Sequence, residues 1–251
     1  MSYFSFCFSP AGGTGKVVNS IIKGWNVPFQ SIDLMKPVEK RTMRAEDLCI
    51  FAVPSYGGRV PSVVIERLGA LRGNGARAVL VAVYGNREID DTLLELSDEL
   101  GRAGFRCVAA VTAVAQHSLL PQIAQGRPDA QDREELEEFG RSLKERERIG
   151  KLNETVKVPG NRPYREYKGV PLKPAASGHC IGCGVCADQC PVGAISELNY
   201  KITDTRKCIS CMRCVAVCPE HIRKVNSVMV FAATAKMKKT CSERKKNQLI
   251  L

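Results

Sequence analysis

Eight of the chain's twelve cysteines fall into two runs that share one spacing, C-x2-C-x2-C-x3-C-P. The first run consists of Cys180, Cys183, Cys186, Cys190 and Pro191, and the second of Cys208, Cys211, Cys214, Cys218 and Pro219. Each cysteine of the first run lies 28 positions before its counterpart in the second. An internal repeat with a fixed period indicates one folding unit used twice.

This spacing is the bacterial-type pattern for [4Fe–4S] clusters. Three closely spaced thiolates can bind three irons of one cluster, whereas the fourth cysteine has left that loop and ligates the other cluster in two-cluster proteins. We therefore assign one cluster to Cys180, Cys183, Cys186 and Cys218, and the other to Cys208, Cys211, Cys214 and Cys190. A zinc site or disulfides are the alternatives. Zinc sites usually show two separated pairs of ligands, and disulfides give no reason for a doubled spacing.

The first 150 residues show strands alternating with helices. Strands are expected over 3–8, 27–34, 48–53, 76–84 and 105–115, and helices over 63–71, 91–103 and 130–149. The continuous apolar run 48–53 is typical of a parallel strand buried on both faces. This alternation predicts an α/β fold, with a doubly wound, five-stranded parallel sheet in the order 2-1-3-4-5.

Three glycine-rich loops, at 9–15, 54–59 and 85–90, follow the first, third and fourth expected strands. Ligands of such a sheet bind beyond the carboxyl ends of its strands, so the loops are expected to converge on one rim. The first loop leads into a helix N-terminus, which suits an anion. A Walker A motif is excluded by Pro10 and Val17, and a dinucleotide fingerprint by Val18.

The first loop is similar to the flavodoxin phosphate loop S/T-x-T-G-x-T, with Ser9, Gly12 and Thr14 in matching positions and Ala11 in place of a hydroxyl residue. Together with the loop 54–61, the run 84–87 and the doubled cysteine motif, it makes residues 1 to about 225 resemble the flavodoxin–ferredoxin fusion proteins of anaerobic bacteria. The expected second domain is a smaller α+β two-cluster ferredoxin domain.

The resemblance implies an FMN site, with the phosphate on loop 9–14 and the isoalloxazine between loops 54–59 and 85–90. Tyr56 is then the candidate stacking ring, although a solvent-exposed tyrosine is the alternative. For Arg87 and Arg59, surface charge is as plausible as flavin contact. The implied contact residues are Ser9, Pro10, Ala11, Gly12, Gly13, Thr14, Pro54, Ser55, Tyr56, Gly57, Gly58, Gly85, Asn86 and Arg87.

Four segments are expected along the chain. Residues 1–150 form the flavodoxin-like FMN-binding domain, 151–177 a proline-containing linker, 178–225 the two-[4Fe–4S] ferredoxin domain, and 226–251 a C-terminal helix and basic tail. The basic stretch 236–246 is expected to fray, which would expose Cys241. Cys7, Cys49 and Cys107 lie in expected strands and are predicted to be buried. His117 is expected to be an ordinary loop residue near the rim, with a proton-handling role as the alternative.

Charge is distributed unevenly. Residues 1–150 carry 19 basic and 19 acidic residues, so the net charge of +11 lies in residues 151–251. Solvation of negatively charged clusters and steering of an acidic redox partner are both compatible with this excess. Nucleic-acid binding is not expected, because aromatics are 6% of the chain and do not alternate with the basic residues. No apolar run approaches 18 residues, and no signal peptide is evident.

These observations predict an electron-transfer protein that passes electrons between FMN, two [4Fe–4S] clusters and redox partner proteins. Clusters and free thiols indicate a reducing cytoplasm. Two alternatives remain: an FMN-dependent oxidoreductase that reduces a small-molecule acceptor, and an iron–sulfur binding module with an empty flavodoxin-like domain. Ala11 is the feature that favours the empty domain.

Overall fold

The computed structural model describes residues 1–176 and 178–251. Its central sheet has the strand order β12-β7-β6-β4-β1-β2. The strands are β1 (Tyr3–Cys7), β2 (Gln30–Asp33), β4 (Leu48–Pro54), β6 (Arg77–Tyr84), β7 (Arg106–Val114) and β12 (Gln248–Ile250). All but β12 pair in parallel. The five strands of the N-terminal half therefore lie in the order 2-1-3-4-5, and the predicted flavodoxin-like topology is confirmed.

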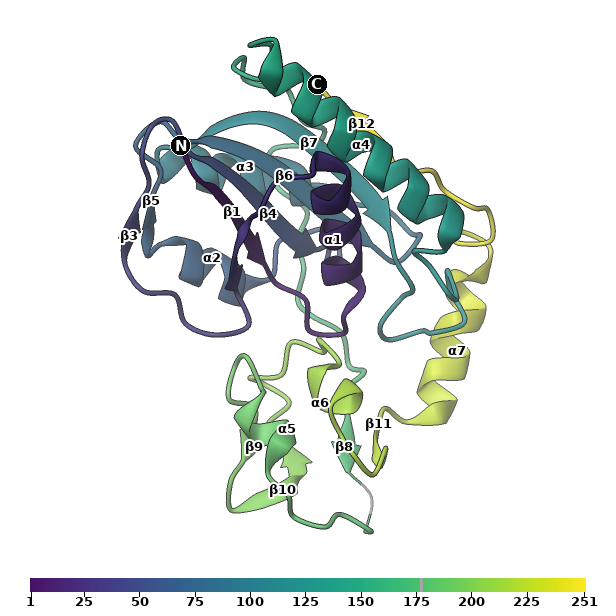
Figure 1. The fold of residues 1–251 in the computed structure, drawn as a ribbon. Helices are drawn as coiled ribbons and strands as arrows, with labels where there is room; N and C mark the ends of the chain where they lie inside the picture. The colour runs from purple at the N-terminus through teal and green to yellow at the C-terminus, as the bar shows by residue number, and fades with distance from the viewer. Residues whose placement is uncertain (177) are drawn as a thin grey trace.

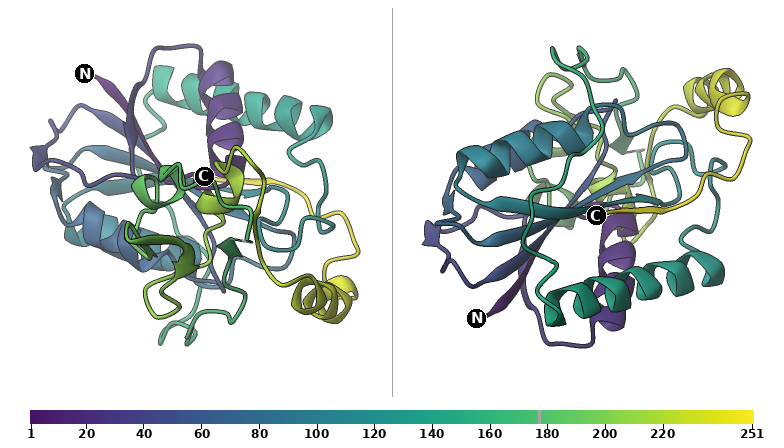
Figure 2. Two further views of the ribbon diagram at one scale, coloured as in Figure 1. Left: turned by 90° about the horizontal axis from the view of Figure 1, so that it is seen from below. Right: turned by 90° about the horizontal axis from the view of Figure 1, so that it is seen from above.

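Helices cover both faces of this sheet, as Figure 2 shows from above. One face packs against α1 (Gly13–Trp25) and α4 (Ala130–Arg148), and the other against α2 (Ser62–Leu68) and α3 (Thr92–Arg102). Along β4, Ile50 packs into the core on the α1–α4 face and Phe51 into the core on the α2–α3 face, and neither side chain is exposed. The apolar run in β4 is thus buried on both faces, as predicted.

A short accessory sheet differs from the prediction. The helix expected over 63–71 ends at Leu68, and β5 (Leu71–Arg72) pairs in parallel with β3 (Arg41–Thr42). The stretch 35–46 is short and charged, which predicts a turn or a small helix. Extended backbone at β3 instead satisfies its polar groups with β5, where Met43 donates its N–H to the Arg72 carbonyl at 2.8 Å.

The segment after α4 follows the α/β domain closely. Residues 151–174, all of which the structure describes, contain no helix or strand. The Asp91 carboxylate accepts backbone N–H groups from Asn161 at 2.7 Å and Arg165 at 2.6 Å. Further along α3, Asp98 binds the side chains of Arg162 and Tyr164. Acidic groups along one helix therefore fix the path of the chain to the cysteine-rich domain.

The cysteine-rich domain lies beneath the sheet, at the ends toward which the parallel strands point (Figure 1). It is built from two antiparallel strand pairs and two short helices. These are β8 (Ala175–Ala176) with β11 (Arg223–Lys224), β9 (Ile195–Ser196) with β10 (Asn199–Thr203), α5 (Val185–Asp188) and α6 (Arg213–Ala216). This is the smaller α+β domain that the sequence predicted.

The C-terminal segment corrects the expectation of a frayed tail. After α7 (Ser227–Lys238) the chain returns to the α/β domain, and β12 pairs antiparallel with the edge strand β7. Asn247 is 4% exposed and Cys241 is 7% exposed. The physical reason is the open edge of β7, whose backbone groups need partners. Basic composition alone does not reveal this pairing.

Asn247 anchors the returning strand. Its Oδ1 accepts the Val114 N–H at 2.9 Å, and its Nδ2 donates to Asp132 at 3.1 Å and Glu135 at 2.7 Å. Asn247→Ala should therefore lower the free energy of unfolding by about 1–3 kcal/mol, because it leaves a buried N–H unpaired. Urea unfolding followed by the fluorescence of Trp25, the only tryptophan, measures the change. Lys246→Ala, at an exposed neighbour, is the control, and equal stability of the two variants would contradict the anchoring role.

Candidate functional site

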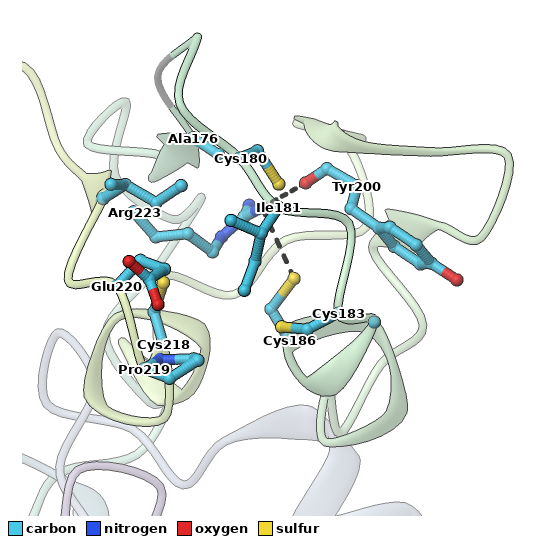
Figure 3. A pocket seen from close by; sticks show the side chains of 12 residues that line it. Ala176, Cys180, Ile181, Cys183, Cys186, Tyr200, Cys218, Pro219, Glu220 and Arg223 are labelled. Atoms are coloured by element: carbon cyan, nitrogen blue, oxygen red, sulfur yellow. Dashed lines mark hydrogen bonds between the residues drawn. The ribbon is translucent and has the colours of Figure 1, made fainter.

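The eight motif cysteines line two separate pockets in the cysteine-rich domain. The outer pocket is lined by Cys180, Cys183, Cys186 and Cys218 (Figure 3). The inner pocket is lined by Cys190, Cys208, Cys211 and Cys214. Each pocket thus takes three cysteines from one motif and the fourth from the other, which is the grouping assigned from the sequence. No disulfide joins any of the twelve cysteines, all of which lie in the described residues.

The backbone around the two motifs repeats as the sequence does. Three positions in or directly after each motif have left-handed backbone, at the same 28-residue spacing: Gly182, Gly184 and Gly193 with φ of 73°, 76° and 58°, and Ser210, Met212 and His221 with φ of 55°, 63° and 51°. A residue other than glycine pays roughly 1–2 kcal/mol for this conformation. The second motif therefore keeps a strained loop geometry, as expected where the loop must wrap a bound group.

Backbone N–H groups point at the fourth cysteine of each motif. The Ala194 N–H donates to the Cys190 sulfur at 3.2 Å. Burial would raise the pKa of the Cys218 thiol, but backbone N–H groups of residues 220–223 outweigh it and bring that pKa below its usual value. Hydrogen bonds of this kind stabilise a thiolate, the form in which cysteine ligates a metal.

Buried hydrogen-bond donors without an acceptor also suit these pockets to iron–sulfur clusters. In the described part of the chain, the buried side-chain atoms without a partner are Arg146 Nε, Ser210 Oγ, Arg213 Nε and Arg223 Nε. Arg213 and Arg223 line the inner and outer pockets, and Ser210 directly precedes Cys211. Buried donors normally have acceptors, and a sulfide-rich cluster would supply them.

The cysteines of each quartet line a common pocket without converging on one point. Among residues 1–176 and 178–251, no three Cys, His, Asp or Glu side chains lie close enough together to hold one metal ion. Thiolates around zinc each lie about 2.3 Å from the metal.

The inner pocket faces the α/β domain. Val192 and Ile209, which line this pocket, pack against the core on the α2–α3 side of the sheet. Tyr56 lies here too: burial, together with nearby Cys211, raises its phenol pKa well above the usual value. Arg67 donates to the Pro191 carbonyl at 2.8 Å. Loop 54–59 therefore adjoins the inner cysteine quartet, and Tyr56 is not the solvent-exposed tyrosine of the alternative interpretation.

The phosphate loop keeps the features of an anion site. Gly12 caps α1 with φ of 87°, and the Ser9 hydroxyl accepts the Gly15 N–H at 2.8 Å. Ala11 and Gly12 at the tip are exposed, whereas Thr14 is buried. The first N–H groups of α1 have no acceptor within the helix, so they can bind a phosphate. The loop also adjoins α6, because Arg213 donates to the Pro10 carbonyl at 3.4 Å.

The two loops expected to hold the isoalloxazine are covered by other parts of the chain. A Cβ on Gly57 would collide with the Tyr167 ring, and one on Gly85 would come within 2.5 Å of the His117 ring. The Asn86 amide donates to the Cys241 and Glu243 carbonyls, both at 2.8 Å. The phosphate half of an FMN site therefore fits this structure, whereas the ring half is closed by Tyr167, His117 and the C-terminal segment.

The sequence reasoning missed three features that shape this region. Tyr167 and residues 241–245 cover the loops, and Arg223 lies inside the outer pocket. A signal for Arg223 was available in the repeat, where its counterpart 28 positions earlier is the apolar Ile195. Cys49 and Cys107 are buried as expected, and Cys7 is partly buried.

The crossed grouping leads to a direct test. Cys218→Ala should remove the cluster of Cys180, Cys183 and Cys186, and Cys190→Ala the other one, because each pocket then keeps only three thiolates. Iron content should fall from about eight to about four per chain in each variant, and Mössbauer and EPR spectra identify the surviving cluster. Cys241→Ala is the control, since this buried thiol lines neither pocket. Loss of the cluster nearest in sequence would overturn the grouping.

His117 makes stability depend on pH. Burial, assisted by Arg87, lowers its pKa from 6.5 to about 4, and its Nδ1 accepts the N–H groups of Leu119 and Leu120 at 3.2 and 3.3 Å. The unfolded chain binds this proton at higher pH, so stability should fall as pH drops from 7.5 to 5.5. Urea unfolding of His117→Asn should show a weaker fall, because Asn can accept an N–H without titrating. Parallel pH profiles would contradict this assignment.

Comparison with known proteins finds matches to two parts of the chain. The profile of the 4Fe-4S dicluster domain matches residues 179–223. One subunit of the ion-translocating oxidoreductase complex of Methanosarcina acetivorans is 41% identical over 54 residues, 21% of this chain and 20% of that protein. The chain therefore spans about a fifth of the length of this curated relative.

Solved structures resemble the N-terminal part. A flavodoxin from Streptococcus pneumonia is 18% identical, with 57% of this chain and 97% of that chain covered and a TM-score of 0.40. An oxidised flavodoxin from Bacillus cereus is 16% identical, with 56% and 95% covered and a TM-score of 0.41. The strand order of the sheet is that of a flavodoxin-like domain, and residues 179–223 match the 4Fe-4S dicluster domain. The chain is therefore a fusion of a flavodoxin-like domain with a ferredoxin-type 4Fe-4S domain.

Proposed function

We propose that this chain is an electron carrier that holds two [4Fe–4S] clusters and one FMN and exchanges electrons with redox partner proteins. The observation that carries the proposal is the grouping of eight cysteines into two four-membered pockets. The proposal takes residues 1–150 as the FMN-binding domain, joined through 151–177 to the two-cluster domain 178–225, with 226–251 as a C-terminal extension that supplies β12 to the sheet.

The two pockets differ in their surroundings, which suggests a route. In the outer pocket, Cys183 is exposed, so electrons can be exchanged there with a partner. In the inner pocket none of the four cysteines is exposed, and loop 54–59 lies alongside. When bound, each cluster supplies a one-electron centre. The chain's own residues orient the thiolates, shield the inner centre from water and place both centres on one side of the sheet.

FMN is the part of the proposal that rests on the phosphate loop. Ser9 shapes the loop, Gly12 gives it left-handed backbone, and the N-terminus of α1 provides donors for the phosphate. The ring would contact Tyr56, Gly57 and Asn86 only if Tyr167 left Gly57 and the C-terminal segment released the Asn86 amide. Flavin binding therefore requires a local rearrangement of the linker and the tail.

The proposed partners are redox proteins. Their contact surfaces are proposed to be acidic, because the cysteine-rich half of this chain is basic. The basic excess of residues 151–251 would attract an acidic surface to the cysteine-rich domain. The similarity to part of an oxidoreductase complex supports a role in electron transfer. Among the residues that the structure describes, every helix is too short or too polar to cross a membrane.

A second candidate is an iron–sulfur protein whose flavodoxin-like domain binds no flavin and serves as a scaffold. The closed ring half favours it: Tyr167 lies on Gly57, His117 lies on Gly85, and the tail occupies Asn86. In this version the domain positions the inner cysteine quartet and contributes no redox centre.

A reductive titration after incubation with FMN and desalting separates the two candidates. The carrier with FMN should take up about four electrons per chain, two at the clusters and two at the flavin, whereas the scaffold should take up about two. The Ala11→Asp variant should lose the two electrons taken up by the flavin, because a carboxylate at the exposed loop tip repels the phosphate. Ala11→Thr restores the hydroxyl of the flavodoxin pattern and should bind FMN more tightly.

Riboflavin, which lacks the phosphate, is the control ligand, and the Ala11→Asp substitution should not change its binding. Two electrons per chain in the wild type and both variants would refute the FMN site and favour the scaffold. Fewer than two electrons, or far fewer than eight irons, would refute the two-cluster proposal itself.

A further inference from the structure

Arg223 is a buried charge at a position where the repeat has an apolar residue. It begins β11, where it pairs with Ala176 of β8, and only 1% of its surface is exposed. Its counterpart 28 positions earlier is Ile195, which begins β9 and is 5% exposed. The two halves of the cysteine-rich domain therefore differ by one positive charge in equivalent buried places.

The guanidinium of Arg223 is held in place by oxygen atoms and by one cysteine of the outer quartet. Nη1 donates to the Tyr200 carbonyl at 2.5 Å and to the Cys186 sulfur at 3.7 Å (Figure 3). Nη2 donates to the Thr203 hydroxyl at 2.5 Å and to the Pro174 carbonyl at 3.3 Å. The three oxygen acceptors are neutral, so they fix the orientation of the guanidinium without neutralising its charge.

A buried arginine of this kind needs a compensating negative charge, because burial of an unpaired ion costs several kcal/mol. Its Nε is buried and has no partner, and the side chain lines the outer pocket. Thiolates and sulfide of a bound cluster would supply both the negative charge and the missing acceptor. The position is therefore explained by the group that the pocket is proposed to hold.

The same guanidinium reaches toward the inner quartet. Cys186, which accepts a hydrogen bond from its Nη1, packs in one small buried core with Cys214 of the inner quartet. The inner pocket has a second basic residue of its own, Arg213, whose Nη2 donates to the Gln189 side chain at 2.5 Å. Arg223 is thus placed between the two quartets, with its direct sulfur contact on the outer one.

We infer that Arg223 is a tuning residue shared by both quartets, which stabilises the reduced clusters and acts more strongly on the outer one. The inference rests on the proposed function. Reduction of a cluster adds one negative charge, with the electron taken from a one-electron donor. A fixed positive charge in a low-dielectric interior favours that added charge. Arg223 would thereby make the outer centre the preferred resting place of an electron.

The test is a potentiometric titration of both clusters, followed by EPR, in the wild type and in Arg223→Gln and Arg223→Lys. For the outer cluster, Arg223→Gln should reduce the equilibrium constant for one-electron reduction at least tenfold, which corresponds to about 59 mV. The decrease at the inner cluster should be smaller. Arg223→Lys keeps the charge and should restore most of the potential.

Arg206→Gln is the matched control, because it removes the same charge from a side chain that is 94% exposed. Unchanged potentials in Arg223→Gln, or equal decreases in the Gln and Lys variants, would overturn the inference while the iron count still upheld the proposed function. If the Arg223→Gln variant fails to assemble clusters, the inference is tested instead by ENDOR of reduced wild-type protein labelled with guanidino-15N arginine. A 15N coupling to the outer cluster that persists in Arg213→Lys supports the inference, and its absence refutes it.

Discussion

Each cysteine quartet takes one member from the other motif, and the fold of the small domain depends on this exchange. The fourth cysteine of each motif lines the other motif's pocket, so each quartet is complete only when the two motifs fold together. The apolar core available to them is minimal: its buried members are Cys186, Ile195 and Cys214, two of which are proposed ligands. A domain of this size rarely folds on hydrophobic burial alone. Binding of the clusters would then contribute directly to its folding free energy.

The α/β domain, by contrast, does not depend on a bound group for its core. Its core is extensive, and the carboxyl rim of its sheet is where an open α/β fold leaves space for a ligand. In this chain, part of that rim is covered by the small domain, through Val192 and Ile209, and part by the linker through Tyr167. The same surface would therefore serve two competing purposes, as the place proposed for a flavin ring and as an interface within the chain.

The sequence was most informative where one local pattern decides the structure. The apolar run in β4 could be read from the sequence because burial on two faces demands apolar residues throughout the strand. The cysteine grouping was readable because the spacing itself encodes it. The pairing of β12, the position of Tyr167 over Gly57 and the burial of Arg223 depend on contacts between distant segments. No local pattern reports such contacts, so these three remained unpredicted.

The return of the chain to β7 makes the cysteine-rich domain an insertion between α4 and the last strand of a single sheet. Both of its ends are fixed to the same rigid body, at Asp91 on the entering side and at Asn247 on the leaving side. Such a domain cannot swing on a flexible arm as a tethered carrier does. Its distance from loop 54–59 is set by folding, so the proposed internal electron transfer would need no diffusional search, and only the encounter with an external partner would depend on concentration.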